Sequence, residues 1–88
     1  MAERSVQILN KNGLHARPAA EIVKTSEKFQ SDITLSKDGM EVNGKSIMGV
    51  MMLAAECGST LIIRADGADA EASIDAIAAL IQNKFGEK

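Results

Sequence analysis

The chain has 88 residues and a net charge of −2, with 45% hydrophobic and 25% charged residues. This is the composition of one soluble globular domain spanning residues 1–88, long enough to bury a core of its own. The negative charge and the absence of Trp and Tyr exclude a general nucleic-acid binder, because the chain offers neither a cationic surface nor a stacking platform for bases.

The amino-terminal residues "MAERSVQIL" lack the basic start and long apolar run of a signal peptide. The longest apolar stretch, residues 47–55, is about half as long as a membrane span. We therefore expect a cytoplasmic protein with no membrane insertion. Its single cysteine, Cys57, has no partner for an internal disulfide, and we expect it to be a small residue packed beneath a loop.

The hydrophobic pattern predicts the order strand, helix, strand, strand, helix, strand, helix. In chain order the elements are expected at residues 5–9, 16–27, 31–37, 40–42, 47–53, 60–65 and 66–85. Asp38-Gly39 is a two-residue hairpin signal between the second and third strands. Because the strands are short and one hairpin is tight, we expect a mostly antiparallel sheet with helices on one face, a two-layer α+β domain.

The first and last helices each have a clear apolar face. In the first helix this face is expected to contain Ala19, Ile22, Val23 and Ser26. In the last helix it is a stripe of Ile74, Ile77, Ala78, Ile81 and Phe85. Asp66 or Asp69 is expected to cap the start of the last helix, and Lys84 and Gly86 to mark its end.

The only histidine, His15, lies where the helix at 16–27 begins. The first backbone N–H groups of a helix have no partner within it, and the aligned peptide dipoles place a partial positive charge there. Both effects disfavour a charged imidazole and favour a bound anion such as a phosphoryl group. Because a neutral ring keeps a nucleophilic lone pair, His15 is a candidate for carrying a phosphoryl group covalently.

Two residues further on, Arg17 supplies a permanent positive charge whose donors match phosphate oxygens. We expect a phosphate to be bound at Ala16 and Arg17. A structural interpretation is also open, in which His15 only caps or packs against the helix and Arg17 is a surface charge. A metal site is not expected, because one histidine with no cysteine or carboxylate at ligand spacing cannot build one.

The segment "IMGVMML" is apolar nearly all round a helix at 47–53. We expect Val50 and Leu53 to face the core, and Ile47, Met48 and Met51 to be exposed as a docking surface for several unlike partners. In the alternative interpretation all of these side chains belong to the core. Ser46 is the expected N-cap of this helix, and it is also a candidate for a regulatory phosphate.

Two motifs resemble a known family. "GLHARPA" (13–19) resembles the phosphorylation site of HPr, the histidine-containing phosphocarrier of the bacterial sugar phosphotransferase system, and "NGKSIMGVMML" (43–53) resembles its regulatory-serine segment. Length and element order agree as well, so the resemblance covers essentially the whole chain. It implies an open-faced β-sandwich: a four-stranded antiparallel sheet covered on one face by three helices (βαββαβα).

The resemblance also implies the activity of the site. His15 would accept a phosphoryl group on Nδ1 from phospho-enzyme I and pass it to a histidine of a sugar-specific enzyme IIA, with Arg17 assisting the transfer. Ser46 would be phosphorylated by an HPr kinase/phosphorylase. The family resemblance further implies a monomer that needs no cofactor and is a carrier rather than an enzyme.

Other functions compete with this one. A regulatory HPr paralogue would act mainly by protein binding, through Ser46 and the apolar segment, and would not need His15 and Arg17. A nitrogen-related HPr paralogue remains open within the carrier class. A histidine-phosphotransfer domain of two-component signalling is a helical bundle, which the Asp38-Gly39 hairpin and the "TLIIRA" strand contradict.

Overall fold

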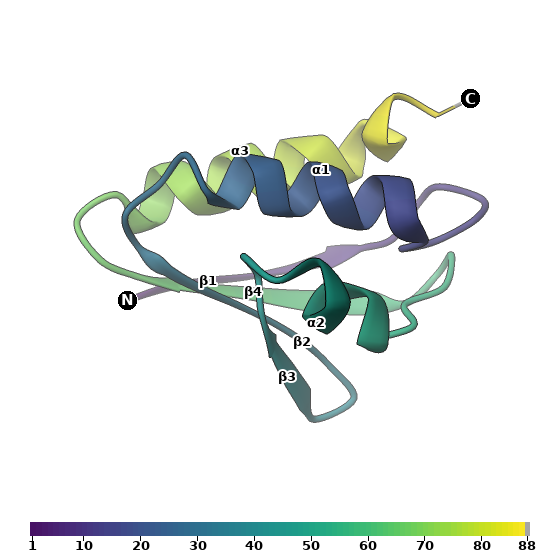
Figure 1. Ribbon diagram of the computed structural model, residues 1–88, viewed down its shortest axis with the longest axis horizontal. Helices are drawn as coiled ribbons and strands as arrows, with labels where there is room; N and C mark the ends of the chain where they lie inside the picture. Colours follow the sequence, from purple (N-terminus) through teal and green to yellow (C-terminus); the bar gives the residue numbers. More distant parts are fainter. Residues whose placement is uncertain (88) are drawn as a thin grey trace.

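The computed structural model describes residues 1–87 of the chain, and its elements follow the predicted order. They are β1 (Ala2–Gln7), α1 (Ala16–Ser26), β2 (Asp32–Lys37), β3 (Met40–Asn43), α2 (Ile47–Met52), β4 (Thr60–Asp66) and α3 (Ala70–Gln82), followed by a short 3₁₀ turn, η1 (Lys84–Gly86). Figure 1 shows three helices on one side of a four-stranded sheet, so the predicted open-faced β-sandwich is confirmed.

The strands are ordered β1-β4-β2-β3, and every neighbouring pair is antiparallel. β4 lies between β1 and β2, and it alternates between core and open face, with Leu61, Ile63 and Ala65 buried. The predicted hairpin joins β2 to β3 through Asp38 and Gly39, which both have positive φ (52° and 84°). Positive φ at both central residues is the requirement of the favoured two-residue turn.

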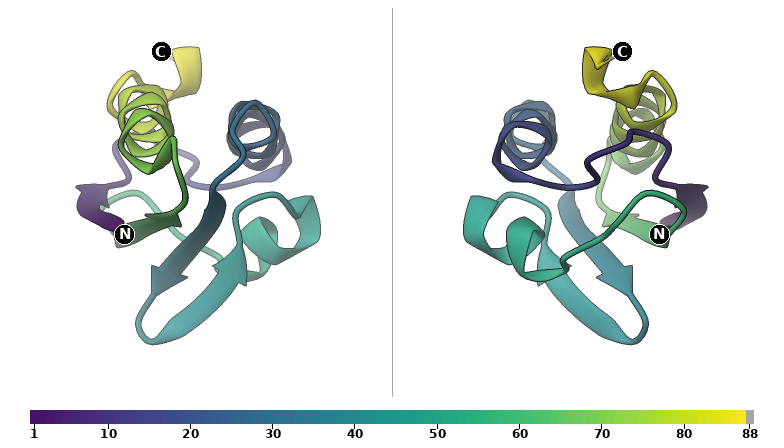
Figure 2. Two further views of the ribbon diagram at one scale, coloured as in Figure 1. Left: turned by 90° about the vertical axis from the view of Figure 1, so that its left-hand side faces the viewer. Right: turned by 90° about the vertical axis from the view of Figure 1, so that its right-hand side faces the viewer.

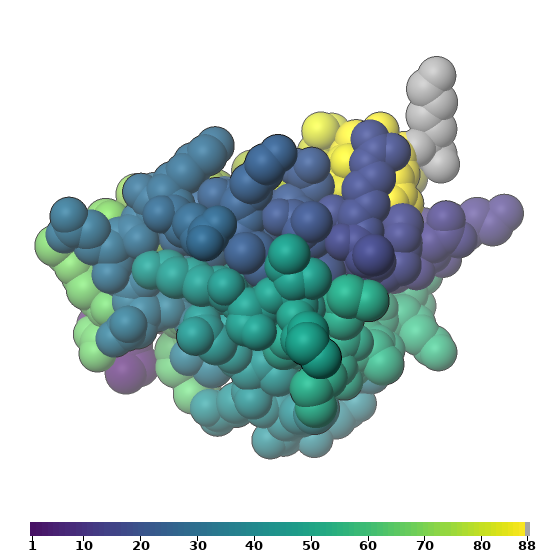
Figure 3. All heavy atoms as spheres, in the orientation of Figure 1, coloured from purple at the N-terminus to yellow at the C-terminus, as the bar shows by residue number. Residues whose placement is uncertain are grey.

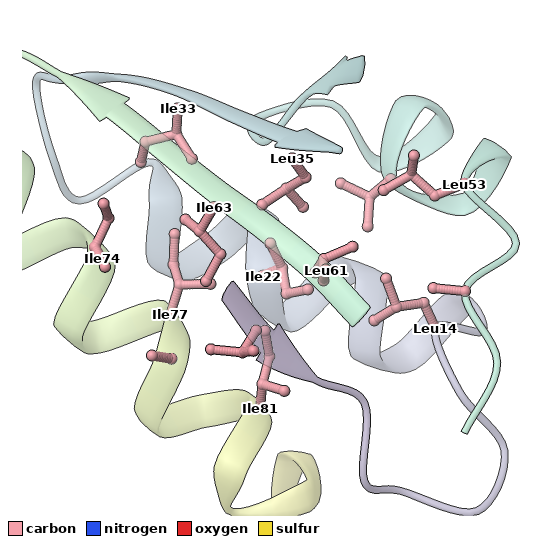
Figure 4. Close-up of a cluster of buried hydrophobic side chains, with 14 of the residues drawn as sticks. Leu14, Ile22, Ile33, Leu35, Leu53, Leu61, Ile63, Ile74, Ile77 and Ile81 are labelled. Carbon is pink, nitrogen blue, oxygen red and sulfur yellow. The ribbon is translucent and has the colours of Figure 1, made fainter. Parts of the chain in front are cut away.

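The helices cover one face of the sheet. Figure 2 shows α1 and α3 side by side over the sheet, with α2 below α1. The β2–β3 hairpin projects at the bottom of both views, away from α1 and α3. Figure 4 shows how the core fills the space between the layers: Ile74, Ile77 and Ile81 of α3 and Ile22 of α1 point toward Ile33, Leu35, Leu61 and Ile63 of the sheet. The predicted apolar faces of both long helices are buried as expected.

The structure corrects several expectations. β1 spans Ala2–Gln7 rather than 5–9, because it pairs residue for residue with β4 from Ala2 to Gln7. Cys57 is exposed rather than buried beneath a loop, and its thiol lies 3.7 Å from the carbonyl oxygen of Leu9. Asp69 does occupy the N-cap position of α3, but its side chain does not cap that helix.

The carboxylate of Asp69 instead binds the loop between α1 and β2. It accepts hydrogen bonds from the backbone N–H groups of Gln30 (2.8 Å) and Ser31 (2.9 Å), and from the hydroxyl of Ser31. The hydrogen bond from the Ser31 hydroxyl is the largest of several effects that hold the pKa of Asp69 below its usual 3.8. The carboxylate therefore connects two loops that are about half the chain apart in sequence.

The last helix ends earlier than predicted, at Gln82 instead of at 84–86. The reason is a reversal of the backbone, because Lys84, Phe85 and Gly86 all have positive φ (56°, 55° and 76°). Phe85 nevertheless remains buried, at 7% exposure. The predicted apolar stripe is thus correct in its membership, although its last residue reaches the core from a turn rather than from the helix. No helix within residues 1–87 has the length and apolarity needed to cross a membrane.

Candidate functional site

His15 is the N-cap residue of α1, but its imidazole is not used for capping. The backbone there is extended (φ −82°, ψ −172°), and the side chain makes no hydrogen bond to the helix. The carbonyl oxygen of His15 accepts the first helical bond, from the N–H of Ala19 at 3.0 Å. The imidazole is 42% exposed. The interpretation of His15 as a capping residue is therefore wrong for its side chain, which remains accessible at the start of the helix.

The loop before His15 packs against the segment that follows α2. Leu14 is buried, and its N–H donates to the carbonyl oxygen of Ala55 at 2.9 Å. Gly13 has φ +66°, and a Cβ there would overlap the carbonyl oxygen of Ala55. Gly13 is thus required both for its backbone conformation and for the close approach of the two loops. These contacts fix the backbone immediately before the imidazole.

The structure adds a carboxylate that the sequence interpretation missed. A carboxylate oxygen of Glu87, which is 18% exposed, lies 2.9 Å from Nε2 of His15. Its other oxygen accepts a hydrogen bond from the side-chain amide of Asn10 at 3.2 Å. The contact joins residues 72 positions apart. No local sequence signal pointed to Glu87, because its position depends on the reversed backbone after α3.

Glu87 selects the tautomer of His15. A carboxylate only accepts hydrogen bonds, so a neutral imidazole beside it must carry its proton on Nε2. The lone pair then lies on Nδ1. The hydrogen bond from His15 is also the largest effect on the pKa of Glu87, which lies below its usual 4.5. The hydrogen bond from Asn10 and the charges of His15 and Arg17 lower this pKa further, whereas desolvation raises it.

The start of α1 supplies donors for an anion. The N–H of Ala19 donates to His15 and Pro18 has no N–H. Within residues 1–87, the free backbone donors of this first turn are therefore those of Ala16 and Arg17. The side chain of Arg17 is exposed, and its charge reaches Glu87. The sequence-based expectation that Ala16 and Arg17 hold phosphate oxygens is compatible with this geometry and remains a prediction.

An apolar patch lies on α2, next to α1. Val50 and Leu53 are buried, as predicted, whereas Ile47, Met48 and Met51 are 45%, 75% and 42% exposed. Met52, which the sequence interpretation did not select, is 61% exposed and completes the patch. Figure 3 shows the side chains of α2 projecting on the same face of the molecule as α1. The interpretation in which all of α2 is core is therefore wrong.

Ser46 caps α2, as predicted. Its hydroxyl oxygen accepts a hydrogen bond from the N–H of Gly49 at 3.1 Å. The residue is only partly buried, and it directly precedes the exposed Ile47 and Met48. A change of charge at Ser46 would therefore lie at the edge of the apolar patch. Within residues 1–87, no three His, Cys, Asp or Glu side chains come close enough together to hold a metal ion.

Fold and site together define a small α+β protein with one accessible imidazole at the start of a helix. One nitrogen of this imidazole is hydrogen-bonded to a carboxylate. A family model described as "PTS HPr component phosphorylation site" matches residues 2–83. The chain belongs to this HPr family.

Related proteins support the assignment over the whole chain. The phosphocarrier protein HPr of Treponema pallidum is 50% identical over 100% of both chains. The HPr-like protein Crh of Halalkalibacterium halodurans is 43% identical over 96% of this chain and 100% of its own. The crystal structure of HPr-C-His from Thermoanaerobacter tengcongensis has a TM-score of 0.96 and 49% identity, covering 100% of this chain and 99% of the other. An HPr dimer from that organism matches with a TM-score of 0.79 and 49% identity, covering 99% of this chain and 100% of the other.

Proposed function

We propose that this chain is a phosphoryl carrier, transiently phosphorylated on Nδ1 of His15 and not itself an enzyme. Its donor is phospho-enzyme I, and its acceptors are sugar-specific enzyme IIA proteins. The single observation that carries the proposal is the accessible imidazole whose Nε2 is bound by Glu87 at 2.9 Å. That contact leaves the nucleophilic lone pair on the other nitrogen.

The residues around His15 suit the transfer step. As Nδ1 forms a bond to phosphorus, the bond between phosphorus and the donor breaks, and the ring gains positive charge because Nε2 keeps its proton. The Glu87 carboxylate stabilises that charge. Arg17 and the free N–H groups at the start of α1 are the donors proposed for the phosphoryl oxygens. The reverse sequence returns the phosphoryl group to an acceptor.

The apolar patch of Ile47, Met48, Met51 and Met52 is the proposed docking surface for enzyme I and enzyme IIA. A carrier must dock to unlike partners in turn, and flexible methionine side chains can repack against different surfaces. The patch adjoins α1, which places it beside the proposed reaction centre. Ser46 is the proposed regulatory site, for an HPr kinase/phosphorylase. We further propose a single-domain cytoplasmic monomer over residues 1–88.

The experiment incubates the protein with phosphoenolpyruvate and enzyme I. We expect one acid-labile phosphate per chain, and none in a His15→Ala variant, because a phosphate on a ring nitrogen is labile to acid whereas a serine ester is not. A suitable control is Ser46→Ala, which should still be labelled. Label that persists in His15→Ala, or that survives acid, would refute the carrier function.

A second candidate function follows from the Crh relative, which is 43% identical. A regulatory paralogue would act through Ser46 and the apolar patch alone. The retention of His15 with Arg17 and Glu87 around it favours the carrier, because binding through α2 has no use for them. A protein that is phosphorylated on Ser46 but takes no label from enzyme I would support the regulatory paralogue.

A further inference from the structure

The C-terminal segment turns back toward the start of α1. After α3 ends at Gln82, three successive residues with positive φ, Lys84–Gly86, reverse the chain. Such backbone is unfavourable for residues other than glycine and persists where packing imposes it. Here the packing is provided by Phe85, which is buried at 7% exposure. Figure 1 shows this segment at the end of the molecule where α1 begins.

The side chain of Asn10 contacts this C-terminal segment through Glu87. It is 1% exposed, and its side-chain amide nitrogen donates both to the carbonyl oxygen of Gly13 (2.8 Å) and to Glu87 (3.2 Å). Both neighbours are acceptors, so the amide must present its nitrogen to them. The amide oxygen is buried without a hydrogen-bond partner among the described residues. The orientation of the Asn10 amide is therefore set by Gly13 and Glu87, and it leaves the amide oxygen without a hydrogen bond.

The contacts form a continuous chain from Gly13 through Asn10 and Glu87 to Nε2 of His15. One end of this chain is the loop that precedes His15, and the other end is the imidazole itself. Each carboxylate oxygen of Glu87 has a separate partner, so the carboxylate is held at two points. A group held in this way can fix both the tautomer and the orientation of a histidine.

This inference rests on the proposed carrier function. We propose that Asn10 is a positioning residue: by donating to Glu87 it holds the carboxylate on Nε2 of His15, which keeps the neutral ring in the Nε2–H tautomer with its Nδ1 lone pair free for phosphoryl transfer. Asn10 does not touch the phosphoryl group. Its effect passes entirely through Glu87.

The first test measures the tautomer and needs no phosphoryl donor. In protein labelled with ¹⁵N at histidine, the pH is raised until the nitrogen chemical shifts of His15 no longer change, and these shifts then report which atom of the neutral ring carries the proton. We expect wild type to be predominantly Nε2–H, and Glu87→Ala and Asn10→Ala to shift toward a mixture of tautomers. Asn83→Ala is the matched control. It removes an exposed amide between the end of α3 and the backbone reversal, and we expect it to resemble wild type.

The second test is a double-mutant cycle on the rate of phosphorylation by enzyme I. We expect Glu87→Ala and Asn10→Ala each to slow the reaction, by about tenfold at most for Asn10. If Asn10 acts only through Glu87, the double variant is no slower than Glu87→Ala alone. Multiplicative losses in the double variant, or an unchanged tautomer in folded Asn10→Ala, would overturn the proposal.

Because Asn10 is buried, Asn10→Ala could fail to fold, so a further experiment uses Glu87→Ala alone. In Glu87→Ala the side-chain amide protons of Asn10 should shift and exchange faster with solvent, since one of their acceptors is gone. Unchanged amide signals or an unchanged His15 tautomer in that variant would overturn the proposal. If wild type takes no phosphoryl group at all, the carrier function fails, while the tautomer measurement still decides the role of Asn10.

Discussion

His15 combines a fixed backbone with a side chain that is bound through one nitrogen. Its carbonyl oxygen begins the hydrogen bonding of α1, and its Nε2 contacts Glu87 at 2.9 Å. The ring can therefore be oriented without being buried, and it is 42% exposed. The imidazole is thus held in one orientation while remaining accessible at the start of α1.

Arg17 is expected to matter for transfer rather than for folding. Its side chain is exposed in the first turn of α1. We expect Arg17→Ala to slow phosphorylation by enzyme I markedly, and to change the free energy of unfolding by about half a kcal/mol or less, as at other surface sites. Urea denaturation and phosphorylation kinetics provide the two measurements.

The matched control for Arg17 is Lys24, an exposed cation in the last turn of the same helix. Lys24→Ala removes the same charge far from His15 and should leave the transfer rate close to that of wild type. A normal transfer rate in Arg17→Ala, together with a large loss of stability, would make Arg17 a structural residue.

Among the elements, α2 is notable for its length and its exposure. It is short, with six residues, and it exposes most of its apolar side chains. Its fixed points are the cap by Ser46, the burial of Val50 and Leu53, and the amine of Lys37, which donates to the carbonyl oxygens of Leu53 (3.2 Å) and Ala54 (3.3 Å). These contacts hold the helix in place while its outer side remains exposed.

Ser46→Asp tests whether α2 lies in the docking surface. A carboxylate can take over the cap, and negative charge at a helix N-terminus is favourable by about 0.3 to 1 kcal/mol, so stability should be equal or slightly higher. The same charge lies beside the apolar patch. Against an acidic partner surface it would be repelled, and like charges at an interface can cost several kcal/mol. We therefore expect slower phosphorylation of His15 by enzyme I in a protein with an unchanged or higher Tm.

The control is Ser46→Asn, which keeps a capping oxygen without the charge and should be phosphorylated at nearly the wild-type rate. An Asp variant as fast as the Asn variant would remove Ser46 from the docking surface and leave it as an N-cap.

Met48, the most exposed side chain of the patch at 75%, tests the docking surface directly. We expect Met48→Glu to weaken binding to enzyme I and leave the fold largely intact, because the side chain has little contact with the core. Isothermal titration and a thermal melt measure the two effects. Met40→Glu places the same charge on an exposed methionine of the hairpin, which projects away from α1, and should bind normally. Unfolding of Met48→Glu would instead assign this side chain to the core.

For the molecule as a whole, stability depends on contacts that join distant parts of the chain. Asp69 connects the start of α3 to the loop after α1. Because its pKa is lower in the folded state than the usual 3.8, this carboxylate stabilises the fold at higher pH, and its contribution is lost as the pH falls through the lowered pKa. We expect Asp69→Asn to lower Tm at neutral pH and to reduce the dependence of stability on pH in the acid range.

Thermal melts between neutral pH and about pH 3 measure this dependence, a range that brackets the usual pKa of an aspartate. Asp66→Asn changes an exposed carboxyl at the end of β4 and is the matched control, expected to keep the wild-type profile. The same profile in Asp69→Asn as in wild type would show that the connection between the two loops contributes little to stability.

Local patterns predicted most of the fold. The apolar spacing located both long helices, Asp38-Gly39 located the hairpin, and the start of α1 was predicted at the correct residue. These features depend on residues close together in sequence. Glu87, Asn10 and the partner of Asp69 could not be predicted in the same way, because each depends on contacts between segments that only the folded chain brings together. The backbone reversal that positions Glu87 begins at Lys84, within the predicted helix at 66–85.

We propose above that Glu87 holds the proton of His15 on Nε2, so that phosphoryl transfer takes place at Nδ1. The most direct measurement is heteronuclear NMR of the phosphorylated, ¹⁵N-histidine-labelled protein, in which coupling between phosphorus and nitrogen identifies the phosphorylated atom. We expect coupling to Nδ1, with the proton retained on Nε2. Coupling to Nε2 would contradict it, because that nitrogen would then have to leave Glu87 before the phosphoryl group arrives.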